Sequence, residues 1–164
     1  KKHKNYIFTE NKRKYKKNHQ PDFQYDSVAV GRFINYLMKK GKKSVAEKVF
    51  YETFNDIKKE TKEEPLAIFE KAIENVSPMI QVVSRRVGGA NYQIPEEVRP
   101  ERKFFLACRW LIEAAGSRKG KPMSVKLAEE IIAASKNEGA AIKKKQNVHK
   151  MAEANRAFAH FARR

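Results

Sequence analysis

The sequence contains almost nothing that would cross-link the chain or anchor it in a membrane. Cys108 is the only cysteine, which excludes a disulfide framework and indicates a reducing compartment. The most apolar stretch, residues 104–112, is interrupted by Arg109 and falls far short of the roughly 18 apolar residues of a membrane span. We therefore exclude stable insertion and expect Cys108 to be a buried, inert thiol.

Residues that would form a catalytic or metal centre are also scarce. There is no glycine-rich phosphate-binding loop, and the paired glutamates are sequence neighbours, which point apart on a helix and to opposite faces of a strand. His149, Glu153 and His160 fall on one side of a predicted helix, but its rise of about 1.5 Å per residue separates the histidines by roughly 16 Å. Zinc requires each nitrogen at about 2 Å. We expect local hydrogen bonds there, with no metal, no cofactor and no enzymatic activity.

Acidic residues are few relative to basic ones. The 164 residues include 36 Lys and Arg against 19 Asp and Glu, a formal net charge of +17. A charge this large is self-repulsive unless a polyanion neutralises it, which predicts a nucleic acid as the partner. An anionic membrane is the rival partner, but the chain has no apolar segment for insertion. We expect no membrane association and no small-molecule substrate.

Residues 1–20 form a strongly basic tail. They hold eight Lys and Arg against one acidic residue and show no steady period, which predicts a segment that is disordered alone. Tyr6, Phe8 and Tyr15 are able to stack on bases while the cations meet phosphates, so we favour an RNA-binding tail over one that only confers solubility. The tail cations assigned to RNA are Lys12, Arg13, Lys14, Lys16 and Lys17.

Apolar residues recur at intervals of three and four over most of the remaining chain, which predicts amphipathic helices. The first runs from about Asp26 to Lys40, with Asp26 or Ser27 as its N-cap and Gly41 placed to end it. A second helix follows the lysine-rich connection. Pro65, in the favoured first-turn position, opens a third helix that stops before the next proline.

Three further helices are expected after residue 99. The fourth is apolar nearly all round over about 104–115 and should be central. A fifth follows a basic loop, and the last runs unbroken from about Ala140 through Ala159. The residues expected to face the core of the first five helices are Val30, Phe33, Ile34, Leu37, Met38, Ala46, Val49, Phe50, Thr53, Phe54, Ile57, Phe69, Ala72, Ile73, Val76, Phe104, Ala107, Cys108, Leu111, Ala115, Leu127, Ala128, Ile131, Ile132 and Ser135.

The stretch at 80–99 departs from the helical pattern and indicates a β-hairpin. Gly88-Gly89 accepts the positive φ angles of a two-residue turn, and centring the turn there pairs Arg86 with Asn91. Strand alternation then defines two faces. The polar face consists of Ser84, Arg86, Asn91 and Gln93. The other face consists of Val83, Arg85, Val87, Ala90, Tyr92 and Ile94. Because a two-stranded hairpin is marginally stable in water, it should lean on the body or on a partner.

The predicted fold class is mainly α. A chain of this length fits one domain with a substantial core. We expect a single-domain bundle of about six helices over residues 21–164, with the hairpin arm at 80–99 between the third and fourth helices. The basic tail at 1–20 precedes this domain.

Lysine and arginine concentrate in two loops and at the start of the last helix. Four ammonium groups around the turn at 39–43 repel one another unless phosphates lie between them, which predicts phosphate contact. The loop at 118–121 and the run at 143–145 repeat this concentration of charge. The residues assigned to RNA from these segments and from the last helix are Lys39, Lys40, Lys42, Lys43, Arg118, Lys119, Lys121, Lys143, Lys144, Lys145 and Lys150.

Five motifs occur together in order: GKKS at 41–44, SRRVGGANYQIP at 84–95, VRPER at 98–102, AAIKKK at 140–145 and HKMAEANRAFAH at 149–160. With them, residues 21–160 resemble bacterial-type ribosomal small-subunit protein seven. The resemblance implies a six-helix bundle with a β-ribbon arm, binding to the 3′ major domain of small-subunit ribosomal RNA, nucleation of head assembly, and a position beside the exit-site tRNA and the mRNA path. The RNA contacts that it implies are Gly41, Lys42, Lys43, Arg85, Arg86, Arg99, Arg102 and Lys143 to Lys145.

The sequence thus predicts a non-enzymatic, RNA-binding ribosomal protein with Asn91 added to the contacts of the arm. Further expected partners are proteins of the subunit head and platform. One alternative of another class is a free-standing regulator that uses the same surface on an mRNA; a ribosomal component should instead stay with small subunits through a high-salt wash. A nuclease would need clustered carboxylates or histidines. The expected location is a ribosome, in the bacterial cytoplasm or in a mitochondrion or plastid, because both chain ends depart from the bacterial pattern.

Overall fold

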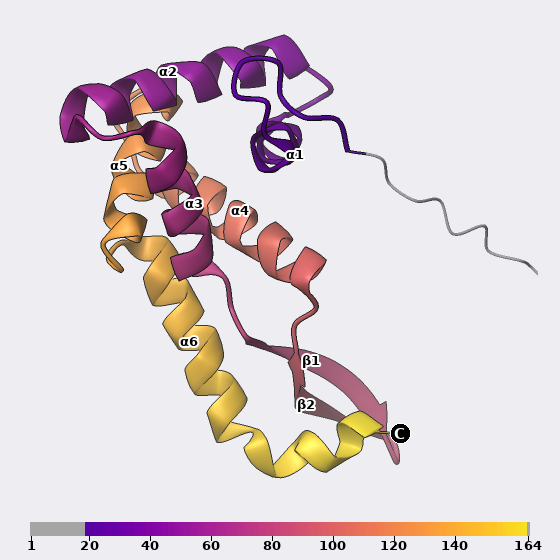
Figure 1. Ribbon diagram of the computed structural model, residues 1–164. Coiled ribbons are helices and arrows are strands. Elements are labelled where there is room, and N and C mark those ends of the chain that lie inside the picture. Colours follow the sequence, from indigo (N-terminus) through magenta and orange to yellow (C-terminus); the bar gives the residue numbers. More distant parts are fainter. Residues whose placement is uncertain (1–18, 164) are drawn as a thin grey trace, which may run out of the picture.

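Residues 19–163, which this computed structural model describes, form six α-helices, a β-hairpin and a C-terminal 3-10 helix (Figure 1). The elements are α1 Val28–Leu37, α2 Lys43–Thr61, α3 Pro65–Val76, β1 Ile80–Val87, β2 Ala90–Glu97, α4 Pro100–Ser117, α5 Met123–Ser135, α6 Ala140–Ala154 and η1 Arg156–Arg163. The predicted mainly α fold with its hairpin arm is confirmed. None of these helices is long and apolar enough to cross a membrane. The tail contacts predicted at 12–17 lie outside the described residues.

The first helix begins where the sequence predicted and ends earlier. Ser27, one of the two predicted N-caps, accepts a hydrogen bond from the Val30 N–H at 3.5 Å. The helix ends at Leu37, because the backbone of Met38 is extended at φ -59° and ψ 132°; the chain then turns towards α2 through two left-handed residues, Lys40 at φ 52° and Gly41 at φ 73°. Gly41 therefore belongs to the turn, and the predicted helix end at Lys40 was wrong.

Aromatic packing joins the first three helices. Phe33, Phe50, Phe54 and Phe69 are fully buried, and five ring pairs among them have centroids 4.3 to 5.8 Å apart, so the rings are in direct contact. The pattern-based prediction of the core is confirmed, with every predicted residue buried or half-buried. The half-buried ones are Met38, Val49, Ile73 and Phe104.

Three helices share the centre of the bundle, and α4, which the sequence predicted to be central, is one of them. α4 contacts α1, α3, α5 and α6, α5 contacts α2, α3, α4 and α6, and α3 contacts α2, α4, α5 and α6. Small residues on α5 allow its neighbours to approach: the Thr53 hydroxyl of α2 donates a hydrogen bond to the buried backbone oxygen of Ser124 at 3.2 Å. Cys108 on α4 is buried as predicted, and burial raises the pKa of its thiol, which disfavours the nucleophilic thiolate.

The last helix is shorter than predicted. α6 ends at Ala154, and the chain continues as the 3-10 helix η1, which turns back beside the hairpin (Figure 1). A 3-10 helix aligns side chains at i and i+3, which puts Phe158 and Phe161 on one side with nearly parallel rings, 6.4 Å and 17° apart. Both rings pack on Tyr92 of β2. The expected unbroken helix was wrong because periodicity does not reveal this docking site.

Replacing Leu111 by alanine should lower the free energy of unfolding by about 2 to 5 kcal/mol, because this fully buried side chain of α4 would leave a cavity. Urea denaturation measures the change. On the same helix, Glu113→Ala removes only an exposed ion pair with Arg109 and should cost at most about 1 kcal/mol. Equal stabilities of the two variants would show that α4 does not form the core.

Candidate nucleic-acid interface

The hairpin arm has the register that the sequence predicted. Gly88 and Gly89 form the turn at φ 58° and 89°, and Arg86 lies opposite Asn91. Both of these side chains are exposed. Ser84 and Gln93 form the next exposed pair on the same face. The tip of the arm therefore presents hydrogen-bonding groups and one positive charge to solvent, without an apolar side chain on that face.

The opposite face of the arm packs on the C-terminal segment. The Tyr92 ring lies 5.3 Å from each of the Phe158 and Phe161 rings. The arm thus has the support that a two-stranded hairpin needs. Arg85, a predicted RNA contact, lies on this half-buried face and forms an ion pair with Glu96. The charge of Arg85 is therefore partly neutralised within the arm, whereas that of the exposed Arg86 is not.

The turn between α1 and α2 presents the four predicted lysines. Lys39, Lys40, Lys42 and Lys43 are all exposed, and the Lys42 N–H donates to the Lys39 carbonyl at 3.1 Å to close the turn. The left-handed conformation of Lys40 costs of the order of 1 kcal/mol, so the surrounding structure has to hold it. Lys43 approaches Glu47 at 3.7 Å, but exposed pairs contribute about 0 to 1 kcal/mol and leave the ammonium free to meet phosphate.

Arginines gather at the start of α4 beside α1. Arg99 precedes the helix and Arg102 lies in its first turn, both exposed, with the Arg102 guanidinium 4.8 Å from the centre of the Phe105 ring. Arg32 of α1 lies 4.4 Å from the centre of the Phe104 ring, and its Nε is buried with no hydrogen-bond partner among the described residues. Sequence reasoning missed Arg32, because no local pattern reveals an aromatic partner so far along the chain.

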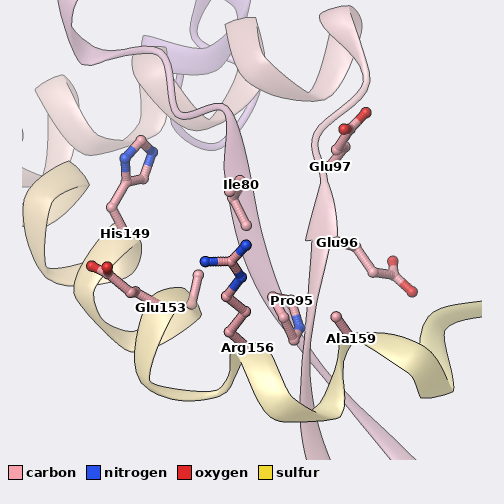
Figure 2. A pocket seen from close by; sticks show the side chains of 9 residues that line it. Ile80, Pro95, Glu96, Glu97, His149, Glu153, Arg156 and Ala159 are labelled. Carbon is pink, nitrogen blue, oxygen red and sulfur yellow. The ribbon is translucent and has the colours of Figure 1, made fainter.

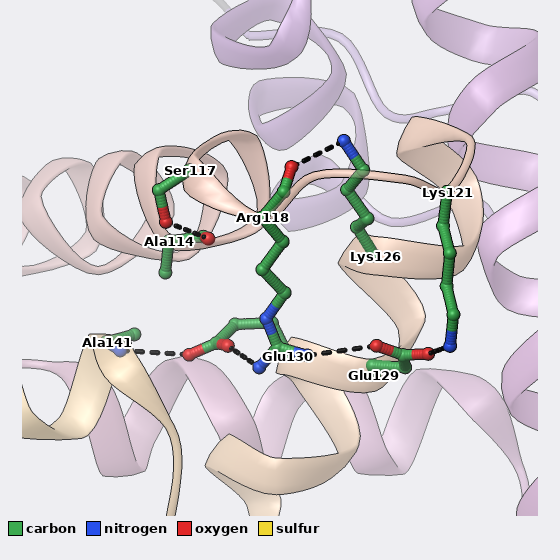
Figure 3. Close-up of polar contacts among 8 residues, drawn as sticks. All are labelled: Ala114, Ser117, Arg118, Lys121, Lys126, Glu129, Glu130 and Ala141. Atoms are coloured by element: carbon green, nitrogen blue, oxygen red, sulfur yellow. Dashed lines mark hydrogen bonds and ion pairs between the residues drawn. The ribbon is translucent and has the colours of Figure 1, made fainter.

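The loop between α4 and α5 uses most of its charge internally. Arg118 donates to Glu129 at 3.0 Å and to Glu130 at 2.5 Å, and Lys121 also pairs with Glu129 (Figure 3). The hydrogen bond from Lys121, together with the charges of both cations, lowers the pKa of Glu129. Of the three predicted contacts in this loop, Lys119 alone lacks a carboxylate partner among the described residues. The structure thus gives Arg118 and Lys121 protein partners, which favours a structural role for both.

Glu130 is the buried centre of this network. Its side chain is fully buried, and its Oε1 accepts a hydrogen bond at 2.9 Å from the Ala141 N–H in the first turn of α6 (Figure 3). Gly139 precedes that turn at φ 96°, and a Cβ there would lie 2.8 Å from the same oxygen. From the sequence, Glu129 and Glu130 were treated only as adjacent carboxylates. The one sequence signal of burial was the position of Glu130 among the apolar residues of this helix.

The lysines of α6 divide between solvent and the interior. Lys143, Lys144 and Lys150 are exposed. Lys145 is half-buried, and its ammonium donates to the backbone oxygen of Asn75 at 2.6 Å, while burial lowers its pKa. Lys145 therefore tethers α6 to the end of α3, and the other three are available to an external partner.

A groove of about 480 Å³ lies between the base of the hairpin, α6 and η1 (Figure 2). His149 lies at its edge, where its Nε2 accepts a hydrogen bond from the Met79 N–H at 3.3 Å. Burial, and secondly the charge of Lys145, lowers the pKa of His149 and favours the neutral form that this bond requires. Figure 2 shows the Arg156 side chain reaching into the groove towards Ile80.

The candidate metal ligands on α6 do not assemble. His149 bonds to the hairpin, Glu153 is an exposed residue that lines the groove, and His160 lies on η1 beyond the end of the helix. Residues 19–163 contain no group of three or more His, Cys, Asp or Glu side chains that could hold a metal ion.

The predicted contacts in these segments lie on two sides of the molecule. The α1–α2 turn, the start of α4 and the hairpin lie towards the right of Figure 1, whereas α6 starts on the left. The 18 residues of α4 extend for about 27 Å, so the cations at its two ends are too far apart for one phosphate. The predicted contacts that are exposed and have hydrogen-bonding groups free for a partner are Lys39, Lys40, Lys42, Lys43, Arg86, Asn91, Arg99, Arg102, Lys119, Lys143, Lys144 and Lys150.

Comparison with known proteins gives one consistent family. Residues 9–156 match the family model described as ribosomal protein S7p/S5e. The small ribosomal subunit protein uS7 of Thermotoga petrophila is 55% identical over 141 residues, which cover 86% of this chain and 91% of that protein. The uS7 protein of Treponema denticola is 55% identical over 141 residues, which cover 86% of this chain and 90% of that protein. The uS7 protein of Elusimicrobium minutum is 54% identical over 142 residues, which cover 87% of this chain and 89% of that protein.

Arg118→Ala should lower the free energy of unfolding by about 1 to 3 kcal/mol, because it removes one of the two donors to the buried Glu130 carboxylate. The neighbouring Lys119→Ala is the matched control, and its effect should stay within about 0.5 kcal/mol. Chemical denaturation compares the two. If Arg118→Ala were as stable as Lys119→Ala, the network would contribute nothing to the fold.

His149→Gln should remove part of the pH dependence of stability. The folded-state pKa of His149 is below 6.5, so its contribution to stability is fully present above pH 6.5 and is lost as the pH falls through the folded pKa. Glutamine keeps an acceptor without titrating. The free energy of unfolding, measured in steps from pH 8 to pH 5, should fall less in the variant than in the wild type, and parallel curves would exclude this role.

Proposed function

Because the chain belongs to the ribosomal protein S7p/S5e family, we propose that it binds the 3′ major domain of the small-subunit ribosomal RNA and nucleates assembly of the subunit head. Membership of this family makes the chain a structural constituent of the small ribosomal subunit and not an enzyme. Its partners are accordingly ribosomal RNA and other proteins of that subunit, and it acts on the ribosome.

The observation that carries the RNA-binding part of this proposal is the division of the basic side chains. Those that the fold needs, such as Arg118 and Lys145, have partners within the chain. Those in the α1–α2 turn, at the start of α4 and at the start of α6 are exposed. Exposed cations without strong internal pairs repel one another, and RNA phosphates between them remove that repulsion.

We assign the tip of the hairpin to the late function, contact with the exit-site tRNA and the mRNA path. Support comes from the arm's construction, because Tyr92 carries the packing on one face while Arg86 and Asn91 remain exposed on the other. An arm that packs through one face is able to offer the other to RNA without loss of stability. The proteins beside it on the subunit head and platform are part of the same proposal.

The double variant Arg86→Ala with Asn91→Ala should fold and enter small subunits normally, because the tip buries little and the other cations remain. Ribosomes carrying it should release exit-site tRNA roughly 10-fold faster or more, as expected for loss of a charged hydrogen bond. The control is Ser84→Ala with Gln93→Ala, the uncharged pair on the same face. Occupancy after a high-salt wash and tRNA retention are measured in one preparation.

The outcomes separate the parts of the proposal. Low occupancy of the double variant, with normal tRNA retention in the ribosomes that form, would make the tip an assembly contact. A wild-type chain that leaves small subunits in the wash would instead indicate a free regulator that uses this surface on an mRNA.

A further inference from the structure

One aromatic side chain lies in a position that the fold does not explain. Phe23 precedes α1 and is 103% exposed, whereas every other aromatic residue of the described chain is buried or half-buried. It has no ring contact within 19–163, although Tyr25, two residues on, packs edge-on against Phe54 at 4.9 Å. Both faces of the Phe23 ring are therefore open.

The backbone that carries Phe23 is held in place. The Asp22 carboxylate is buried and accepts hydrogen bonds from the N–H groups of Gln24 and Tyr25 and from the Tyr51 hydroxyl, at 2.9 to 3.2 Å. The Asp22 N–H donates to the Ser27 carbonyl at 3.1 Å. Exposure of Phe23 is thus set by a fixed turn, which reduces the ordering needed when a partner binds.

The surroundings of Phe23 are suited to a nucleotide. It lines a groove of about 740 Å³ between the segment before α1, α1 itself and the start of α2. The exposed Pro21 adds apolar surface, the exposed Asn35 adds an amide donor and acceptor, and Lys43 supplies a cation from the lysine turn. A stacking ring, an amide and an ammonium are the groups that recognise a base face, a base edge and a phosphate.

We propose that Phe23 is the stacking platform for an unpaired nucleobase of RNA, with the adjoining phosphate on Lys43 and the lysine turn. An apolar protein segment fits less well, because it would leave the lysines unpaired. The carboxylates in the groove are compatible with RNA: Asp22 is used by the turn, Glu47 lies beside Lys43, and Asp26 can accept from a base amine.

This inference rests on the proposed RNA binding, and one binding experiment tests both. The probe is a transcript of the 3′ major domain of the organism's own small-subunit ribosomal RNA. Phe23→Ala should weaken binding roughly 5- to 150-fold, the range for loss of one stacked base, without changing the salt dependence. Phe23→Leu should resemble Phe23→Ala, whereas Phe23→Trp should bind like the wild type, and the transcript should quench the fluorescence of this added, exposed tryptophan more than that of the buried Trp110 in the wild type. Val45→Ala, at an exposed aliphatic residue of α2, is the control and should have no effect.

A second arm distinguishes the two hypotheses. Replacing Lys39, Lys40, Lys42 and Lys43 by alanine should reduce the magnitude of the slope of log affinity against log salt by up to about 3 to 4, whether or not Phe23 stacks. If this variant weakens binding and Phe23→Ala or Phe23→Leu binds like the wild type, stacking is wrong and RNA binding stands. If the wild type does not bind the transcript above a tRNA control, the proposed function fails and stacking with it. Normal RNA affinity of Phe23→Ala combined with loss from small subunits would identify Phe23 as a protein contact and overturn the proposal.

Discussion

The buried carboxylate of Glu130 fixes the direction of α6, and the arm of the molecule depends on that direction. A fully buried charge is tolerated only when it is paired and hydrogen-bonded. Arg118 supplies the opposite charge, and the Ala141 N–H supplies a donor from the start of α6, where the helix dipole also favours a negative group. Gly139 leaves room for this contact. A second contact holds α6 near its start: the backbone oxygen of Asn75 accepts a hydrogen bond from Lys145 of α6. The side-chain amide of Asn75 in turn donates to the last two carbonyls of α5, at 3.0 Å each.

From this anchored start, α6 leads away from the helical core towards the hairpin. His149 on one side of α6 accepts a hydrogen bond from the backbone at the base of the hairpin. The 3-10 helix that follows α6 places Phe158 and Phe161 against Tyr92. The hairpin is thus held at its base and along one face. This arrangement explains how a two-stranded ribbon, marginal alone in water, is able to present its polar tip to a partner.

The positive charge of the chain has two physical roles. A smaller set of cations neutralises carboxylates or caps carbonyls inside the molecule, and these side chains are half-buried or paired, as for Arg118 and Lys145. A larger set is exposed along loops and helix starts and gains little from the folded chain itself. For a structural protein of the small ribosomal subunit, the second set is where binding energy towards RNA arises, and the first set orients the elements that carry it.

The sequence by itself determined the features that depend on neighbours along the chain. Helical periodicity located the core faces, Pro65 marked the start of α3, and the pair Gly88-Gly89 with strand alternation determined the hairpin register down to Arg86 opposite Asn91. The motifs were sufficient to identify the family. These signals are local, because a turn, a cap or an amphipathic face is encoded within a few residues.

Only the tertiary structure decided which charged residues are used inside the protein. The pairing of Arg118 with Glu130, the contact of Lys145 with Asn75 and the cation–π contact of Arg32 with Phe104 all join residues far apart in the sequence. The end of α6 was decided in the same way, by aromatic packing on a strand that a local period cannot reveal. Composition shows how much charge a chain carries, but the environment that each charge meets is set by the elements that pack around it.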